Sequence, residues 1–315
     1  MTIKLCDYTL RAGGITSAQR AAVAAGLADA GIEHIELGCL SAGEALTDYY
    51  PLAEGAGASC SVMIDTERFD CAALPECNGK IARIRLPLRQ GNADRVLKAV
   101  AVLAAKGYSS VCDLVGAYDY SDRELISLCE SFGSTGIDQL NIVDGARLSD
   151  SRLIQRIALI LDNNLAASVK IGLRSEGNSG LARFVADSFL GTAFRKERAL
   201  VIEGTLLGRG TGYGSVCTEC MADMLSEDFG ARYDYGKLIR LISDAIPEAN
   251  RDPGNIGAYH PVFYLAAKNQ VDGDYGRYFL SRGIPLSGLD ALLKKLAETQ
   301  RFCLFDESVA EQMLA

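Results

Sequence analysis

The chain has 315 residues, of which 49% are hydrophobic and 23% are charged, so it can bury a large core, and this composition argues against wholesale disorder. Its formal net charge is −8 and its pI is near 5.0, which argues against the basic surface that nucleic-acid binding requires. Small anionic substrates are compatible with this charge, because a local arginine cluster can outweigh the net field. No apolar secretory segment and no membrane-spanning stretch is visible. We therefore expect a cytoplasmic protein without a membrane or nucleic-acid partner.

Cysteine usage fits a reducing compartment. The ten cysteines are Cys6, Cys39, Cys60, Cys71, Cys77, Cys112, Cys129, Cys217, Cys220 and Cys303. They are scattered, and several fall in apolar runs, where free thiols act as small buried hydrophobes. The single C-x-x-C pair, at Cys217 and Cys220, has no second pair and no histidine nearby. Because a structural zinc site needs about four ligands, we expect no metal there.

Strand-like and helix-like segments alternate along the first two thirds of the chain. The expected strands are residues 3–7, 34–38, 59–64, 82–86, 110–115, 139–143, 168–173 and 200–203. The expected helices between them are residues 18–30, 94–106, 122–132, 149–161 and 180–190. Residues 66–80 contain Pro75 and Gly79 and show no convincing helix. Eight strands with intervening helices predict an α/β fold, a (β/α)8 TIM barrel, rather than a doubly wound sheet.

A glycine-rich loop, residues 208–214, follows the eighth strand. A helix is expected to open after this loop, near Val216. The backbone amides of the loop could cradle a phosphate or could shape the barrel mouth, and we favour the second use. The expected helices beyond it are residues 234–246, 262–268, 286–299 and 307–314. Residues 247–257, rich in proline, glycine and asparagine, are the best place for a break in the chain. We therefore expect a barrel domain at residues 1–228 and a helical C-terminal extension at residues 229–315.

Charged and polar residues gather where the expected strands end, at the face where such barrels carry their active sites. They are Asp7, Arg11, Glu36, Asp65, Arg85, Arg89, Asp113, Asn141, Asp144, Arg174, Glu176 and Glu203. Charges are almost never fully buried without a partner. The cluster could be a pocket in which arginines hold a carboxylate, phosphate or enolate, or a set of structural ion pairs that closes the barrel mouth. For the cluster as a whole we favour a site.

Four motifs in chain order resemble the DRE-TIM metallolyase superfamily, which includes 4-hydroxy-2-oxovalerate aldolase, hydroxymethylglutaryl-CoA lyase and isopropylmalate synthase. They are D-Y-T-L-R-A-G-G at 7–14, A-G-I-E-H-I-E-L-G at 30–38, V-D-G-A at 143–146, and I-E-G-T with L-G-R-G-T-G at 202–212. The likeness covers roughly residues 3–220. It implies a TIM barrel and makes Arg11 the counterpart of the family's enolate-stabilising arginine.

The chain departs from this family at the residues that bind its catalytic divalent metal. The family has an aspartate directly after the arginine of its first motif, and this chain has Ala12. The family has two histidines after strand seven, and here their positions carry Arg174 and Glu176. An asparagine of the family's glycine-rich loop falls at or near Tyr213. The only histidines of this chain are His34 and His260.

A fixed guanidinium at position 174 would repel a divalent cation by several kcal/mol, by rough analogy with like charges ~4 Å apart at an effective dielectric of ~20. Arg174 therefore makes more sense as a replacement for the metal, and we expect no metal or other cofactor. With Arg11 it could clamp a 2-oxo acid or a phosphate. Glu176 could hold Arg174 in place or act as a general base. The alternative is an Arg174–Glu176 ion pair that merely fills the vacated pocket.

The first functional hypothesis is an aldolase-type lyase or Claisen-type synthase that acts through the enolate of a 2-oxo acid. Its expected catalytic residues are Arg11, Glu36, Arg174 and Glu176, and its expected substrate-binding residues are Asp7, Asp113, Asn141, Asp144, Glu203 and Tyr213. The second hypothesis is a non-catalytic homologue that binds a ligand or a partner subunit. A third, an isomerase of a phosphorylated ligand, would need binding groups that we do not find. We expect a homo-oligomer, and a dehydrogenase partner is compatible with the family resemblance.

Overall fold

A computed structural model describes residues 2–12, 15–41, 43–133, 135–144, 148, 150–176, 181–210, 214–246, 266–267, 269–284, 286–299 and 304–314. Eight parallel strands follow one another around a closed barrel, each paired with the next. Pairing of β1 with β8, from Thr2 opposite Ala199 to Asp7 opposite Gly204, closes the ring. The predicted TIM barrel is therefore confirmed. Its strands are β1 (Thr2–Asp7), β2 (His34–Leu40), β3 (Ser59–Ile64), β4 (Arg83–Leu88), β5 (Ser109–Val115), β6 (Gln139–Val143), β7 (Lys170–Arg174) and β8 (Ala199–Thr205), and a two-residue β9 (Val216–Cys217) adds to β8.

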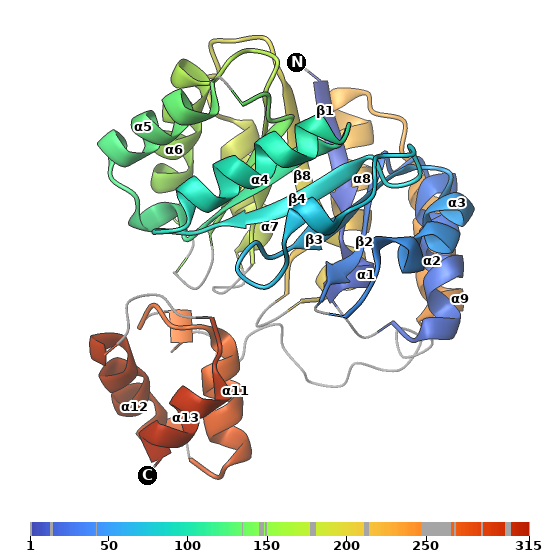
Figure 1. The fold of residues 1–315 in the computed structure, drawn as a ribbon. Coiled ribbons are helices and arrows are strands. Elements are labelled where there is room, and N and C mark those ends of the chain that lie inside the picture. The colour runs from blue at the N-terminus through green and yellow to red at the C-terminus, as the bar shows by residue number, and fades with distance from the viewer. Residues whose placement is uncertain are drawn as a thin grey trace.

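Helices cover the outside of the barrel (Figure 1). They are α2 (Ser17–Asp29), α3 (Tyr50–Ala56), α4 (Ala93–Ala105), α5 (Asp122–Phe132), α6 (Ser151–Asn164), α7 (Ala182–Leu190), α8 (Thr218–Phe229) and α9 (Tyr235–Ala245), and the short α1 (Thr9–Ala12) directly follows the end of β1. Single 3-10 turns are η1 (Leu46–Tyr49), η2 (Cys71–Ala73), η3 (Ala117–Asp119) and η4 (Leu206–Gly208). Among the described residues, no helix is long and apolar enough to cross a lipid bilayer.

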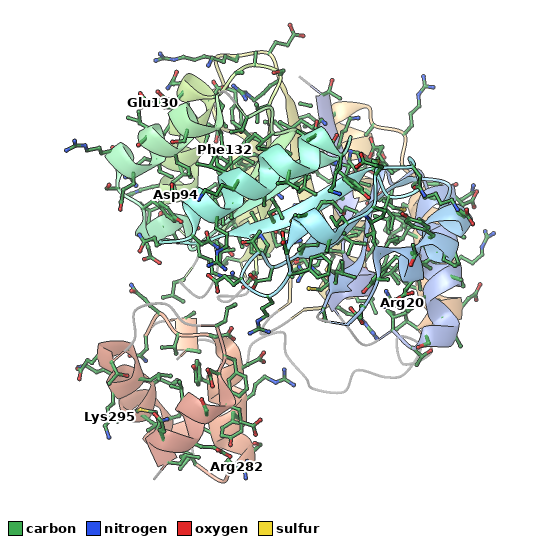
Figure 2. The ribbon with its side chains drawn as sticks, viewed as in Figure 1. Arg20, Asp94, Glu130, Phe132, Arg282 and Lys295 are labelled. Atoms are coloured by element: carbon green, nitrogen blue, oxygen red, sulfur yellow. The ribbon has the colours of Figure 1, made fainter. Side chains whose placement is uncertain are left out.

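Helix α5 illustrates why the local sequence folds as it does. Ser121 precedes it, and its hydroxyl accepts from the Glu124 amide at 3.3 Å while the Glu124 carboxylate accepts from the Ser121 amide at 2.7 Å. This reciprocal cap fixes the start of the helix. Phe132 is buried against the barrel and Glu130, two residues earlier, is exposed (Figure 2). The helical spacing of apolar residues therefore matches the face that packs on the sheet.

The third β/α unit lacks a regular helix, as its proline and glycine predict. Only the 3-10 turn η2 lies between β3 and β4. Three helices were not expected from the sequence: α1, α3 and α11 (Gly273–Ser281). The first two are only 4 and 7 residues long, and α11 contains two glycines, which lower helix propensity. The expected helix at 262–268 and the expected break at 247–257 lie wholly or mostly outside the described residues.

The C-terminal helices α11, α12 (Leu286–Thr299) and α13 (Glu307–Leu314) form a unit with its own apolar core. Tyr275, Phe279 and Leu293 are among its fully buried residues. Helix α9 instead packs against α2 and α8, and its Leu238 belongs to the barrel core. In Figure 1 the unit lies at the side toward which the strands run, opposite the N-terminus. The expected domain boundary between residues 228 and 229 stays a prediction. The contacts of α9 with α2 and α8 place this helix with the barrel.

The barrel interior is unusually polar for a fold whose centre is commonly filled by branched apolar side chains. The buried polar residues on its strands include Glu36, Arg85, Asp113, Asn141 and Glu203. A side chain at position 172 would place its Cβ 1.9 Å from Oδ1 of Asn141, so Gly172 leaves the space that this amide needs. The backbone thus brings charged groups from many strands into a single interior layer.

Candidate active site

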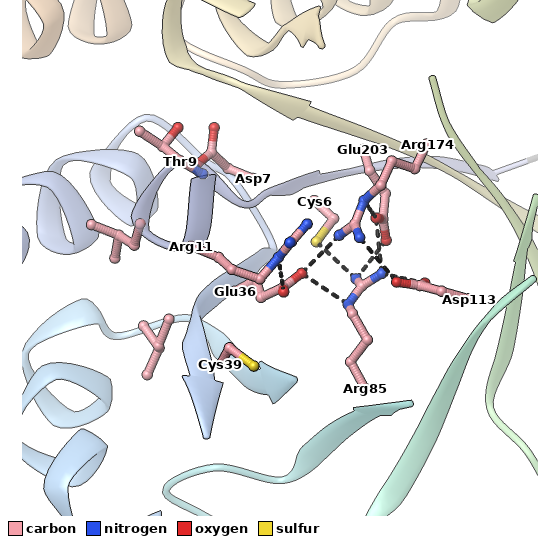
Figure 3. Close-up of polar contacts among 12 residues, drawn as sticks. Cys6, Asp7, Thr9, Arg11, Glu36, Cys39, Arg85, Asp113, Arg174 and Glu203 are labelled. Carbon is pink, nitrogen blue, oxygen red and sulfur yellow. Dashed lines mark hydrogen bonds and ion pairs between the residues drawn. The ribbon is translucent and has the colours of Figure 1, made fainter. Parts of the chain in front are cut away.

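Three guanidiniums and three carboxylates form one connected network inside the barrel (Figure 3). Each member comes from a different element, so only the closed barrel brings them together. They are Arg11 on α1, Glu36 on β2, Arg85 on β4, Asp113 on β5, Arg174 on β7 and Glu203 on β8. We call these six residues the Arg–carboxylate network. Their formal charges cancel, so the network needs no further counter-ion.

Arg85 lies at the centre of the network and is 1% exposed. Its Nε is 2.9 Å from Oε2 of Glu36, and its Nη1 donates to Oδ1 of Asp113 at 2.6 Å. Nη1 and Nη2 also donate to the two oxygens of Glu203 at 2.9 and 2.6 Å. A planar guanidinium suits such bidentate contacts. Arg85 therefore joins carboxylates from three strands that are distant in sequence.

Arg174 reaches the same three carboxylates from the other side. Nη2 donates to Oε2 of Glu36 at 2.9 Å, Nη1 donates to Oδ2 of Asp113 at 3.0 Å, and Nε lies 3.0 Å from Oε2 of Glu203. Among the ion pairs of the described residues, Arg174 has none with Glu176. Arg174 is thus held by Glu36, Asp113 and Glu203 and not by an ion pair with Glu176.

Arg11 is the guanidinium of the network that is open to solvent. Its side chain is 22% exposed, against 2% for Arg85 and 5% for Arg174, and its Nε pairs with Glu36. The ring of Tyr8 lies 5.0 Å from the guanidinium carbon of Arg11 and 4.3 Å from that of Arg174. A cation over an aromatic face is stabilised by the ring's quadrupole. Tyr8 thus packs both cations into place at the barrel mouth.

The network is held in its charged form. Burial opposes ionisation of Glu36, but Arg11, Arg85 and Arg174 outweigh it and hold the pKa of this carboxyl below its usual value. Burial likewise opposes ionisation of Asp113, and Arg85, Arg174 and Asn141 hold its pKa low. Burial lowers the pKa of the two buried guanidiniums, but their carboxylate neighbours reverse this and raise it. Glu36 and Asp113 are therefore anions at neutral pH.

Asn141 supports the carboxylates from β6. Its Nδ2 donates to Oδ1 of Asp113 at 2.7 Å and to Oε1 of Glu203 at 2.9 Å. Its Oδ1 accepts from Gln139 at 2.6 Å, which fixes the orientation of the amide. Since these hydrogen bonds satisfy buried polar atoms, Asn141 holds the carboxylates of Asp113 and Glu203 in place.

Glu176 lies just beyond β7 and has a different environment. Oδ1 of Asp144 accepts from the Glu176 amide at 2.8 Å, and Oδ2 of Asp144 accepts from the Ser175 hydroxyl at 2.6 Å. Burial, followed by Asp144 and by Asp272 at the start of the C-terminal unit, raises the pKa of Glu176 to about 7, against the opposing effect of Arg174 and Arg11. Glu176 can therefore take or release a proton near neutral pH.

Asp7 ends β1 and is fully buried. Its Oδ1 accepts from the Thr9 amide at 2.8 Å and its Oδ2 accepts from the Thr218 hydroxyl at 2.6 Å. Burial raises its pKa to about 6 although these hydrogen bonds favour the anion. In Figure 3 it lies beside Thr9 and away from the network. Asp7 thus fastens β1 to α1 and α8.

The structure brings together six of the residues expected at the site from the sequence: Arg11, Glu36, Asp113, Asn141, Arg174 and Glu203. Glu176 and Asp144 lie together at the end of β7, and Tyr213 is outside the described residues. The strand-end charges Asp65 and Arg89 pair with each other at 3.4 Å. The sequence analysis placed Arg85 in the strand-end cluster without a role of its own, and it gave Tyr8 no role. The alternation of arginine with apolar residues at positions 83–86 was the available signal that Arg85 points inward.

The residues present do not fit the divalent metal that the family resemblance implies. Ala12 offers no donor atom, and Arg174 places a cation among the nearby carboxylates. Glu36, Asp113 and Glu203 each pair with at least two guanidiniums. A divalent ion would have to displace buried, hydrogen-bonded arginines to reach these oxygens.

Comparisons with known proteins found one relative in sequence and many in fold. No protein-family model matches the chain. It is 24% identical over 273 residues to a 4-hydroxy-2-oxovalerate aldolase of Moorella thermoacetica, covering 78% of this chain and 77% of the relative.

Solved structures share the same barrel. The N-terminal domain of a candidate aldolase from Bacteroides vulgatus has a TM-score of 0.74 at 16% identity, over 88% of this chain and 96% of that one. The HMG-CoA lyase of Brucella melitensis has a TM-score of 0.60 at 15% identity, over 76% and 96%. The carboxyl transferase domain of Rhizobium etli pyruvate carboxylase (Y628A, with pyruvate) has a TM-score of 0.72 at 12% identity, over 99% and 61%. These structures match the barrel fold, and the sequence match to the Moorella thermoacetica aldolase supports the resemblance to the DRE-TIM metallolyases.

Proposed function

We propose that this chain, a diverged relative of the DRE-TIM metallolyases, is an aldolase-type lyase or Claisen-type synthase that acts through the enolate of a 2-oxo acid. The observation that supports this most is the presence at one barrel mouth of a partly exposed arginine, Arg11, and an acid of near-neutral pKa, Glu176. The two groups interact electrostatically. Together they supply a cation for a developing enolate and a base for the proton.

Arg11 is the group that would receive the substrate anion. A guanidinium has five N–H donors, and the pairing with Glu36 is made through the Nε of Arg11. Among the described residues none accepts a hydrogen bond from its remaining donors, which a carboxylate or an enolate oxygen could use. Arg174 has three contacts in the network, so it acts mainly by holding Glu36, Asp113 and Glu203. The sequence predicted a clamp of two arginines. In this proposal Arg11 alone binds the substrate, and the buried Arg85 and Arg174 hold the carboxylates of the network.

Glu176 is the better candidate than Glu36 for moving a proton. Glu36 lies between three guanidiniums, and its lowered pKa makes it a weak base. The pKa of Glu176 is about 7, so a large share of it is ionised at neutral pH and its conjugate acid still donates. In this proposal Glu36 positions Arg11. Asp144 positions Glu176 by accepting a hydrogen bond from the Glu176 backbone amide.

In the cleavage direction, the proposed substrate class is a 4-hydroxy-2-oxo acid. Glu176 takes the proton of the 4-hydroxyl, the C3–C4 bond breaks, and an aldehyde leaves. The bonding electrons pass through C2 to the 2-oxo oxygen, which becomes an enolate beside Arg11. Protonation at C3 then gives the shortened 2-oxo acid. The synthase direction begins with removal of a C3 proton and uses the same groups.

A panel of 4-hydroxy-2-oxo acids tests this reaction, with the released 2-oxo acid measured by its reduction with NADH and a coupling dehydrogenase. Loss of an oxyanion-stabilising or proton-transfer group typically costs ~10²-fold or more in turnover, and we expect this for Arg11→Met and Glu176→Gln. Glu130→Gln, on the exposed face of α5, is the matched control. Cleavage by Glu176→Gln at the wild-type rate would remove Glu176 from the mechanism.

The second candidate is a non-catalytic homologue that binds a ligand or a partner subunit, including a dehydrogenase. The closed, charge-neutral network favours it, because every carboxylate in that layer already has arginine partners. Calorimetric titration with 2-oxo acids separates the two candidates. Binding without turnover in the panel supports the non-catalytic homologue, and binding with turnover supports the lyase. Self-association of the chain stays a separate proposal, to be measured by sedimentation.

A further inference from the structure

Three side chains with metal-binding atoms gather at the start of α8, outside the barrel interior. The thiols of Cys217 and Cys220 and one carboxylate oxygen of Glu219 all lie within 4.8 Å of one another. Cys220 is exposed, Cys217 is partly buried and Glu219 is 6% exposed. We call these residues the Cys–Glu–Cys cluster. The paired cysteines alone offered too few ligands, and the structure adds a third.

The backbone around the cluster makes room for it and orients it. Cys217 is the last residue of β9 and pairs with Thr205 of β8. A Cβ at Gly208 would lie 3.0 Å from Sγ of Cys217, so glycine leaves this thiol its space. Both carboxylate oxygens of Glu219 accept from the Leu207 amide at 3.1 Å. That amide turns the carboxylate toward the loop that follows β8.

We propose that the Cys–Glu–Cys cluster binds a thiophilic divalent cation such as Zn²⁺. Two thiolates and one carboxylate are ligands that zinc accepts, and a site with three protein ligands leaves the fourth position to water. A carboxylate has about four lone-pair sites, so the Leu207 amide leaves Glu219 able to ligate. Deprotonation of both thiols on binding would release two protons to solvent.

The surrounding charges are compatible with a cation. Arg183 of α7 is near Cys220, but its Nε pairs with Oδ1 of Asp187 at 2.8 Å, which offsets its charge. Asp223, one turn along α8, adds negative charge near Cys220. This setting differs from the Arg–carboxylate network, where each acid already has arginine partners. The proposed site is therefore independent of the proposed enolate chemistry.

A cation here would stabilise the junction of β8, η4 and α8. Thr218 lies between the ligands in sequence, and its hydroxyl donates to Oδ2 of Asp7 at 2.6 Å. Glu219 contacts η4 through Leu207, and Cys217 contacts β8. Binding would thus join β8, the loop after it and α8 at one point, beside the end of β1.

Cobalt substitution of the reduced, chelator-treated full-length chain tests the proposal. We expect one equivalent of Co²⁺ to give thiolate-to-cobalt charge-transfer absorption and the visible bands of a four-coordinate ion, and Zn²⁺ to displace it. Cys220→Ser removes an exposed ligand and is expected to abolish the charge-transfer band. Glu219→Gln is expected to weaken Co²⁺ binding by at least the ~10-fold that loss of a metal's supporting partner costs.

Cys39→Ser is the matched control, since Cys39 is partly buried and lies outside the cluster. It should retain the full Co²⁺ spectrum. Wild-type protein without a charge-transfer band, or a band of equal strength in Cys220→Ser, would overturn the proposal. Thiol titration before loading shows that the cysteines are reduced, so that a disulfide is not mistaken for weak binding.

Discussion

Arg174 stands opposite Glu203 in the register of β7 and β8, and its Nε lies 3.0 Å from the Glu203 carboxylate. The same guanidinium contacts Glu36 and Asp113, so a fixed cation links three acids inside the barrel. Position 174 is where the family resemblance implies a metal-binding histidine. The chain thus supplies positive charge there from its own sequence, and it supplies matching negative charge from neighbouring strands.

Arg85→Met is expected to destabilise the protein strongly. Removal of this buried guanidinium leaves Glu36, Asp113 and Glu203 with less positive charge than they need, and breaking a buried ion pair costs about 3–5 kcal/mol. Chemical denaturation of the purified variant measures the loss. Arg277→Met is the control, because its pair with Asp274 is exposed and such pairs contribute little. Equal stability of both variants would contradict the network's structural role.

Glu176 is expected to set the pH dependence of turnover. Its pKa of about 7 means that the base form declines below neutrality, so kcat/KM should fall as pH drops through about 7. A pH–rate profile on the best substrate of the panel measures this. A profile that is flat between about pH 6 and about pH 8 would show that another group carries the proton.

The same carboxyl should also give a stability signature. Its folded pKa is raised from 4.5 to about 7, so its contribution favours the folded state fully below about pH 4.5 and is lost as the pH rises through about 7. Glu176→Gln removes the titrating carboxyl, so the variant does not lose this stabilisation as the pH rises. Thermal melts should therefore show the variant gaining stability over wild type at about pH 8 relative to about pH 5. Asp7, with a pKa of about 6, acts in the same direction and remains in both proteins.

Restoring the family's ligand set should create a metal site. The triple variant Ala12→Asp/Arg174→His/Glu176→His replaces a buried cation by donors, and it leaves Glu36, Asp113 and Glu203 with less positive charge than before. We expect it to bind Mn²⁺ or Mg²⁺ more tightly than wild type and to lose native activity. Isothermal titration with Mn²⁺ checks the first point. Unchanged activity in the metal-loaded variant would argue against a functional role for Arg174.

The barrel and the location of its polar residues could be predicted from the sequence, because strand periodicity and strand-end motifs are local signals. The ion pairs inside the barrel could not be predicted in this way. Arg85 meets Glu36, Asp113 and Glu203 only through the closure of the barrel, across 118 residues of sequence in the last case. An Arg174–Glu176 contact was one of the alternatives that the sequence left open. Strand alternation puts Arg174 inside the barrel, while Glu176 follows the strand end.

The Cys–Glu–Cys cluster was missed for a related reason. The C-x-x-C spacing was visible, but the position of the Glu219 carboxylate near both thiols depends on the fold, in which this carboxylate accepts from the Leu207 amide. Leu207 has a φ of 59°, a left-handed conformation unusual for leucine. No sequence pattern predicts that turn.

Deuterium exchange at C3 of a 2-oxo acid tests the central claim most directly, since it needs no second substrate. Pyruvate or 2-oxobutyrate is incubated with the chain in D₂O, and loss of the C3 proton signal is followed by NMR. We predict exchange above the buffer rate in wild type and in Glu130→Gln, and its loss in Arg11→Met and Glu176→Gln. Exchange at the buffer rate with wild-type protein that binds these acids would contradict enolate formation and support the non-catalytic homologue.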